Sequence, residues 1–417
     1  PERLPRFVGG LLTWTTVGAG ALGLVICVAA PAALPRVTAF ETGTRALASE
    51  FLWELLPFMV LTSAGAVLRV ACEVHGRFRV VAVTPLVRAG VVIATTWALL
   101  GPLGPHALPW GLVAGELVQL FWWGAWLHWT GVRIRPDLRL DPAVRQVGRD
   151  LAPILGGEVL VALNLVVDKA FAGTLESGSV ATLEYADRAR VIPQTLLEST
   201  LVMVAYATWS NLRASGRLHE ARRAVDQALR WTLALSVAPV AGMFIGRFVL
   251  VSLLYERGAF TPADTAATAG VLAWYLPGVV PNLLGILAVR AHVVERNLRL
   301  VFALGAASLL ANAAFNAVLI QPMGLEGLAL ATTLNMVLVP GVYLAFLRRH
   351  LDSRAREWAV VLGVAAAAAS IALFVELGPG APTSLRDPVL WSSAVACLAL
   401  LGLAWRVTRP TSERPDA

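Results

Sequence analysis

The sequence FVGGLLTWTTVGAGALGLVICVAAPAALP occupies residues 7–35 and contains no charged side chain. A helix needs about 20 mostly apolar residues to cross the hydrocarbon core of a bilayer. The run is too long for the apolar part of a signal peptide, and it ends without a small-residue cleavage motif. It therefore predicts a membrane-spanning helix close to the start of the chain.

The composition extends this conclusion to most of the chain. Hydrophobic residues make up 57% of the 417 residues, charged residues make up 15%, and the mean hydropathy is +0.68. A soluble domain carries about 25% charged and about 45–50% apolar residues. A soluble core could not hide this much apolar surface, so cytosolic enzymes, secreted disulfide scaffolds and disordered proteins are excluded.

Further apolar runs follow along the chain and predict an all-α, polytopic membrane helix bundle. We expect about twelve spans of about 20 residues, centred on residues 8–30, 51–70, 84–101, 108–129, 151–172, 191–210, 231–254, 265–289, 299–320, 326–347, 358–377 and 388–405.

Basic residues predict the orientation of these spans, because cytoplasmic connections are enriched in arginine and lysine. Arginines gather before the first span and after every even-numbered one, as in residues 69–79, 133–149 and 213–223. The connections at residues 101–108 and 321–324 contain neither arginine nor lysine. Both termini are therefore expected in the cytoplasm. The net charge of +7 and the pI near 10.0 indicate topology, and no nucleic-acid partner is expected.

Two of the cytoplasmic connections are long. Residues 131–150 include PDLRLDP at 136–142, and we expect a hinge-like linker there. In the second connection Leu218, Ala221, Val225 and Leu229 recur at helical spacing between arginines. That spacing predicts an amphipathic helix lying in the membrane interface.

Polar side chains at membrane depth are the first candidates for a functional site, because they are costly there without a partner or a cavity. The fifth span carries Glu158, Asn164, Asp168 and Lys169. At about 100° per residue, Asn164 and Asp168 lie about 40° apart around the helix. A substrate site and a clamp between helices both fit this pattern.

The sixth span begins after Asp187 and Arg188 and continues with Gln194. Arg188 stands where the helix enters the membrane, so it could extend to water or point into a cavity and bind an anion such as phosphate. On the ninth span Ser308, Asn312 and Asn316 form one stripe, which is typical of polar side chains that join helices.

Motifs for covalent chemistry are missing from the sequence. It has no Walker A loop, no HExxH and no recognisable Ser/His/Asp or Cys/His arrangement. The three cysteines lie in apolar runs without metal-ligand spacing. We therefore expect a protein that is not an enzyme and that needs no cofactor or metal.

Several segments together resemble the MurJ/MviN family of lipid II flippases, which belongs to the multidrug/oligosaccharidyl-lipid/polysaccharide exporter superfamily. They are SGSV at 177–180, YADR at 185–188 with Pro193, LYERGAFT at 254–261, GRF at 76–78 and GLEGLA at 324–329. The resemblance covers essentially the whole chain, and the segment at 254–261 is the most specific.

The resemblance implies two lobes of helices around a central cavity, with two additional helices after them. Residues 1–130 would be a partial N-terminal lobe of four spans that lacks the family's first two helices, and 131–150 a cytoplasmic linker. Residues 151–348 would form a C-terminal lobe of six spans, 357–408 the additional helices and 409–417 a cytoplasmic tail.

The resemblance also implies a substrate, a mechanism and a location. A lipid-linked sugar pyrophosphate such as lipid II would cross the bacterial cytoplasmic membrane by alternating access, with membrane lipids and cell-envelope synthesis proteins as partners. Arg188 matches the family's cavity arginine in the second lobe, so it would bind the pyrophosphate. The resemblance assigns no other ligand. From their positions on the polar faces of the fifth and sixth spans, further residues are expected to surround the head group: Asp187, Glu158, Asn164, Asp168 and Gln194.

Other functions remain open from the sequence. The chain could export another polysaccharide precursor or a drug, although a drug/cation antiporter would favour acidic residues over Arg188. It could also be a non-transporting membrane scaffold for cell-envelope synthesis. An intramembrane glycosyltransferase is a third alternative, for which no catalytic pair of carboxylates is visible.

Overall fold

The computed structural model describes residues 3–37, 41–74, 78–131, 137–138, 142–198, 202–295 and 297–347. Every regular element in these ranges is a helix, which confirms the expected all-α class. The chain forms two compact units, Pro1–Ile154 and Leu155–Ala417. The expected helices at 357–408 and the tail at 409–417 lie outside the described residues, as does part of the 131–150 linker.

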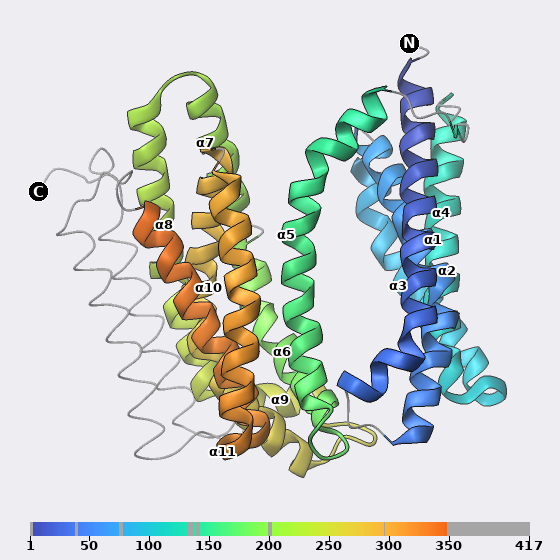
Figure 1. Ribbon diagram of the computed structural model, residues 1–417, viewed down its shortest axis with the longest axis vertical. Coiled ribbons are helices and arrows are strands. Elements are labelled where there is room, and N and C mark those ends of the chain that lie inside the picture. Colours follow the sequence, from blue (N-terminus) through green and yellow to red (C-terminus); the bar gives the residue numbers. More distant parts are fainter. Residues whose placement is uncertain are drawn as a thin grey trace, which may run out of the picture. The chain divides into compact units, whose positions relative to one another are not determined.

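The first unit contains four long helices and one short turn (Figure 1). They are α1 (Arg3–Val37), α2 (Thr42–Val74), α3 (Phe78–Leu103), the 3-10 turn η1 (Gly104–His106) and α4 (Ala107–Trp129). Helix α1 packs on α2, and α4 packs on both α2 and α3. Their core includes Leu68, Cys72, Trp123 and Leu127.

The second unit is built around a long pair of helices, α10 and α11, which run side by side (Figure 1). The helices that follow α4 along the chain are α5 (Pro142–Ala172), α6 (Ser179–Leu197), α7 (Met203–Ala214), α8 (Leu218–Ile245), α9 (Arg247–Tyr255), α10 (Pro262–Val294) and α11 (Leu298–Leu347). The division between the two units falls within α5.

Six helical stretches among the described residues are long and apolar enough to cross a membrane. Two of them, Val80–Trp129 and Arg299–Leu347, hold 50 and 49 residues. At a rise of about 1.5 Å per residue, each would be more than twice as long as a bilayer core about 30 Å thick. Each is interrupted in the middle, the first at η1 and the second at Gly324, where φ is +56°. Each interrupted stretch therefore supplies two helices.

Large apolar side chains cover the outside of these helices. Trp97, Leu86 and Phe121 are 81%, 76% and 73% exposed. A soluble monomer seldom exposes wide apolar patches to water. The chain is therefore a multi-pass membrane protein, with lipid as the solvent of its outer surface.

Helices extend into both of the long connections. Helix α5 begins at Pro142, so the second half of the expected 131–150 linker is helical. Proline is well suited to the first turn of a helix, because its missing N–H and fixed φ cost nothing there.

The expected interfacial helix at 218–229 is part of α8, which continues without a break to Ile245. Ala221, Val225 and Leu229 are buried against protein, in a cluster that includes Trp209 and Leu287. The interfacial assignment was wrong because an apolar stripe at helical spacing serves protein packing as well as lipid contact.

Glycine allows α10 and α11 to approach each other closely. A Cβ atom at Gly285 would lie 2.5 Å from the Cγ of Pro340 and 2.7 Å from its Cβ. The proline ring is rigid and cannot move aside. We expect Gly285→Ala to destabilise the second unit by about 1–3 kcal/mol through overpacking.

Thermal unfolding of the detergent-solubilised chain measures this effect. Gly341→Ala is the matched control, because a Cβ at Gly341 meets nothing within 4 Å. An equal unfolding temperature for the two variants would contradict the close approach of these helices.

Candidate functional site

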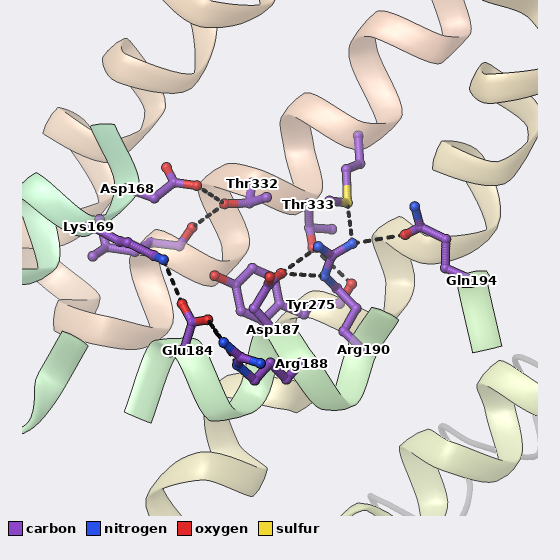
Figure 2. A network of polar contacts seen from close by, with 12 residues as sticks. Asp168, Lys169, Glu184, Asp187, Arg188, Arg190, Gln194, Tyr275, Thr332 and Thr333 are labelled. Carbon is purple, nitrogen blue, oxygen red and sulfur yellow. Dashed lines mark hydrogen bonds and ion pairs between the residues drawn. The ribbon is translucent and has the colours of Figure 1, made fainter. Parts of the chain in front are cut away.

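Polar side chains of the second unit gather where α5, α6, α10 and α11 meet (Figure 2). Three groups of contacts make up the network: a buried cluster around Asp168, an exposed chain of charges around Glu184, and a buried arginine, Arg190.

Asp168 on α5 accepts hydrogen bonds from three side chains of α11. Its Oδ1 lies 2.6 Å from the Nδ2 of Asn312 and 2.6 Å from the Nδ2 of Asn316. The hydroxyl of Thr332 donates to Oδ2 over 3.2 Å. Asp168 is 6% exposed and the two asparagines are at most 1% exposed. The asparagine stripe therefore joins α5 to α11, as its spacing indicated.

The same cluster is the part of the described network best suited to a small hard cation. The Oδ1 atoms of Asn312 and Asn316 are buried and have no hydrogen-bond partner among the described residues. The orientation of an amide is an assignment made from its surroundings. If both amides turned over, their oxygens would face the Asp168 carboxylate and the Thr332 hydroxyl. Carboxylate, amide and hydroxyl oxygens are suitable ligands for such a cation.

Glu184 on α6 holds two cations on the outside of the unit. Its Oε2 lies 2.6 Å from the Nζ of Lys169 on α5, and its Oε1 lies 3.0 Å from the Nη2 of Arg188 one turn later. The side chains of Lys169, Arg188 and Glu184 are 48%, 69% and 32% exposed. The group carries two positive charges and one negative charge, all accessible from outside the unit.

Arg190 is buried on the other side of α6. Its Nε donates to Asp187 Oδ1 over 2.9 Å, and its Nη2 donates to the same oxygen. Its Nη1 donates to Gln194 Oε1 over 3.2 Å and lies 3.7 Å from the sulfur of Met336. The guanidinium carbon lies 5.4 Å from the centre of the Tyr275 ring. These contacts tie α6 to α10 and α11.

A known protein family matches most of the chain. The family described as "Lipid II flippase MurJ" matches residues 3–381. The chain belongs to the MurJ family.

Individual MurJ relatives align over parts of their length. The probable lipid II flippase MurJ of Vibrio cholerae is 26% identical over 366 residues, which are 85% of this chain and 66% of the relative. That of Rhizobium meliloti is 31% identical over 175 residues, 41% of this chain and 32% of the relative. That of Bdellovibrio bacteriovorus is 25% identical over 240 residues, which are 56% of this chain and 46% of the relative. The aligned parts thus cover between 32% and 66% of the length of these relatives.

Solved structures show the same fold at low sequence identity. A lipid II flippase MurJ in an inward closed conformation aligns with a TM-score of 0.75 and 18% identity, over 98% of this chain and 84% of that one. An inward-facing multidrug MATE transporter of the MOP superfamily aligns with a TM-score of 0.68 and 13% identity, over 81% of this chain and 80% of that one. The architecture is therefore that of a MurJ/MATE-like helix bundle.

The structure distributes the expected site residues of this MurJ family member among different contacts. Asp168 lies in the buried cluster, Asp187 and Gln194 contact Arg190, and Arg188 belongs to the exposed chain of charges. In the part of the chain that the structure describes, the Nδ2 of Asn164 donates to the carbonyl of Leu160 in its own helix, over 3.0 Å.

The side chain of Glu158 lies outside the described residues. The role of all six residues in binding substrate stays a prediction.

Arg190 and Glu184 were not expected from the sequence. Their spacing held the signal, because Asp187, Arg190 and Gln194 follow each other at i, i+3 and i+7, and Glu184 precedes Arg188 by four residues. Side chains three or four residues apart are neighbours on a helix. Arg188 and Arg190 lie about 160° apart around α6, so one is exposed while the other is buried.

The first unit contains a further polar pair between two helices. Arg88 on α3 donates from Nε to Glu116 on α4 over 2.6 Å, and Gln119 also donates to Glu116. Glu116 is 3% exposed. This pair joins two helices that cross apolar surroundings, where an unpaired carboxylate would be costly.

The Arg190–Asp187 pair should contribute measurably to stability. Arg190→Met leaves Asp187 without its cation, and breaking a fully buried pair costs about 3–5 kcal/mol. Asp187 is 27% exposed, so we expect a loss nearer to about 2 kcal/mol.

A double-mutant cycle with Asp187→Asn, followed by thermal unfolding, measures this coupling. The double variant should be more stable than the sum of the two single losses allows. Strict additivity would show that the pair is not coupled.

Proposed function

We propose that this chain is a flippase that translocates lipid II, the lipid-linked precursor of peptidoglycan. The observation that carries the proposal is the family match over residues 3–381. The relatives named above are described as probable lipid II flippases, and they are longer than the part that aligns with this chain.

The proposed mechanism is alternating access. About twelve spans would form two lobes around a central cavity, with residues 136–142 near the hinge between them. The cavity would open alternately to the two sides of the membrane, as expected of transporters built from repeated helix bundles. The fold similarity to MurJ and MATE structures supports this architecture.

Arginine is the residue best suited to carry the head group. The pyrophosphate of a lipid-linked sugar is an anion, and moving it through an apolar interior requires compensating positive charge. A guanidinium can donate two parallel hydrogen bonds to phosphate oxygens. Arg188 is 69% exposed, so it is free to exchange its partner, whereas Arg190 is buried and committed to Asp187.

The bacterial cytoplasmic membrane is the proposed location, with both termini in the cytoplasm. Support comes from arginine-rich connections on one side, at 133–149, 213–223 and 290–299, and from their absence at 101–108 and 321–324. Cell-envelope synthesis proteins, which use the translocated precursor, are proposed partners.

Reconstitution tests the proposed activity directly. The 417-residue chain is placed in liposomes with lipid II that carries a fluorescent head group, and a membrane-impermeant reductant is added from outside. Without translocation about half of the signal is protected, since only the outer leaflet is reached. We expect the chain to remove most of that protection. A fluorescent phosphatidylethanolamine is the control lipid. Equal translocation of both lipids, or of neither, would contradict the proposal.

A further inference from the structure

Glu184 occupies an unusual position between two cations that come from different helices. One carboxylate oxygen contacts Lys169 Nζ at 2.6 Å, and the other contacts Arg188 Nη2 at 3.0 Å (Figure 2). A helix-surface ion pair normally joins one cation to one anion, as Arg217 and Glu220 do on α8. Here one carboxylate bridges two cations, which therefore lie within the span of a single two-oxygen anion.

The charges nearby leave this group with a positive excess. Lys169 and Arg188 contribute two positive charges and Glu184 contributes one negative charge. Asp187, the next acidic residue on α6, accepts two hydrogen bonds from Arg190. Asp168, which precedes Lys169, is 6% exposed and accepts its hydrogen bonds from α11. Both carboxylates are thus already engaged by other partners.

We propose that Lys169 and Arg188 together form a binding site for a diphosphate group, and that Glu184 takes the place of this group when the site is empty. The inference rests on the proposed function, because it assigns the diphosphate of the lipid-linked sugar to these two side chains. Lys169 is thereby a second anion ligand beside Arg188.

The chemistry of the two anions favours this exchange. A diphosphate presents oxygens on two phosphorus atoms, so it can contact both cations at once, as the two oxygens of Glu184 do. It carries at least two negative charges where Glu184 carries one, and hydrogen bonds between charged partners are stronger than neutral ones. Lys169 and Arg188 are 48% and 69% exposed, so a ligand can reach them without rearranging the core.

Aromatic rings next to the cations could contact a sugar attached to the diphosphate. Tyr185 follows Glu184 directly and is 37% exposed. Its ring centre lies 4.9 Å from that of Tyr255 and 5.2 Å from that of Phe260. Tyr185 lies three residues before Arg188 on α6, and side chains at this spacing are neighbours on a helix, so these rings border the proposed site. Tyrosine offers an apolar face and a polar hydroxyl together.

Titration with inorganic pyrophosphate tests the site. The full chain is placed in nanodiscs of zwitterionic lipid, and binding is measured by calorimetry. Lys169→Gln and Arg188→Gln should each weaken pyrophosphate binding roughly tenfold, which corresponds to the loss of one charge-assisted contact. Glu184→Gln should strengthen it by a similar factor, since the competing anion is gone. Lys169→Arg, which keeps the charge, should bind like the wild type.

The matched control is Glu220→Gln, which removes an exposed glutamate that pairs with one exposed arginine, Arg217. We expect no change in pyrophosphate affinity for this variant. Thermal unfolding of each variant verifies that it is folded before binding is measured.

A different result is expected if the salt bridge serves only to join α5 to α6. Glu184→Gln would then bind pyrophosphate no better than the wild type, and that outcome overturns the inference. Wild-type affinity in Lys169→Gln also overturns it, because a single cation would then suffice.

The liposome assay separates this inference from the proposed function. If the chain translocates lipid II but all variants bind pyrophosphate like the wild type, the two-cation site is contradicted and the proposed flippase function is supported. The expected order of affinities without lipid II translocation would support the site and point to another diphosphate-linked substrate.

Discussion

Asp168→Ala is expected to destabilise the second unit more than any other single substitution of a polar residue on α5. The change removes the acceptor for Asn312, Asn316 and Thr332. A buried donor that loses its partner costs about 1–3 kcal/mol. Removing a charge from apolar surroundings offsets part of this loss. We therefore expect a net decrease of about 2–4 kcal/mol in the free energy of unfolding.

Unfolding of the solubilised chain by heat or by increasing SDS measures this difference. Asn164→Ala is the matched control, because Asn164 lies one turn earlier on α5 and donates only to its own helix. It should change the stability by less than about 0.5 kcal/mol. Asp168→Asn, which keeps one carbonyl acceptor, should fall between them. Equal stability of Asp168→Ala and Asn164→Ala would show that the cluster does not hold α5 to α11.

Arg188→Ala is expected to abolish most lipid II translocation while leaving the protein folded. The ion pair of Arg188 with Glu184 is exposed, and such pairs contribute at most about 1 kcal/mol to stability. The loss of charge-assisted contacts with a diphosphate is larger, at about 1.5–3 kcal/mol. The translocation rate should therefore fall between roughly tenfold and a hundredfold.

The liposome assay with fluorescent lipid II measures the rate, and Arg217→Ala is its matched control. Arg217 is also an exposed arginine, 58% accessible, and pairs with a glutamate three residues away. It should keep the wild-type rate. Arg188→Lys keeps the charge but loses the two-pronged geometry, so it should retain part of the activity. A wild-type rate in Arg188→Ala would contradict the proposed role of this residue.

The contrast between Arg188 and Arg190 illustrates how far sequence reasoning reaches into the site. The YADR motif predicted a role for Arg188. The helical spacing of Asp187, Arg190 and Gln194 also places these side chains on one face of the helix, but no role for Arg190 was predicted from it. Geometry predicts that the two arginines point in nearly opposite directions from α6. Which direction leads into the core depends on where α10 and α11 lie, and Tyr275 and Met336 on those helices decide it.

The asparagine stripe of α11 gives the complementary case. Ser308, Asn312 and Asn316 at i, i+4 and i+8 predicted contacts between helices. The structure confirms contacts for all three residues. Asn312 and Asn316 donate to Asp168, more than 140 residues away in sequence, and Ser308 accepts a hydrogen bond from Asn335 in the second helix of α11. The periodicity of one helix marks a face, but it contains no information about which helix covers that face.

The sequence by itself determined that this protein is a bundle of membrane helices. Length and apolarity are local properties, and the backbone in lipid must satisfy its own hydrogen bonds within each segment. Tertiary structure alone decided that α8 packs against protein instead of lying in the interface, that Lys169 meets Glu184, and that Arg190 is buried. The packing of α8 and the burial of Arg190 depend on neighbours such as Leu287 and Tyr275, which lie far away in the sequence. The contact of Lys169 with Glu184 depends on how α5 and α6 pack.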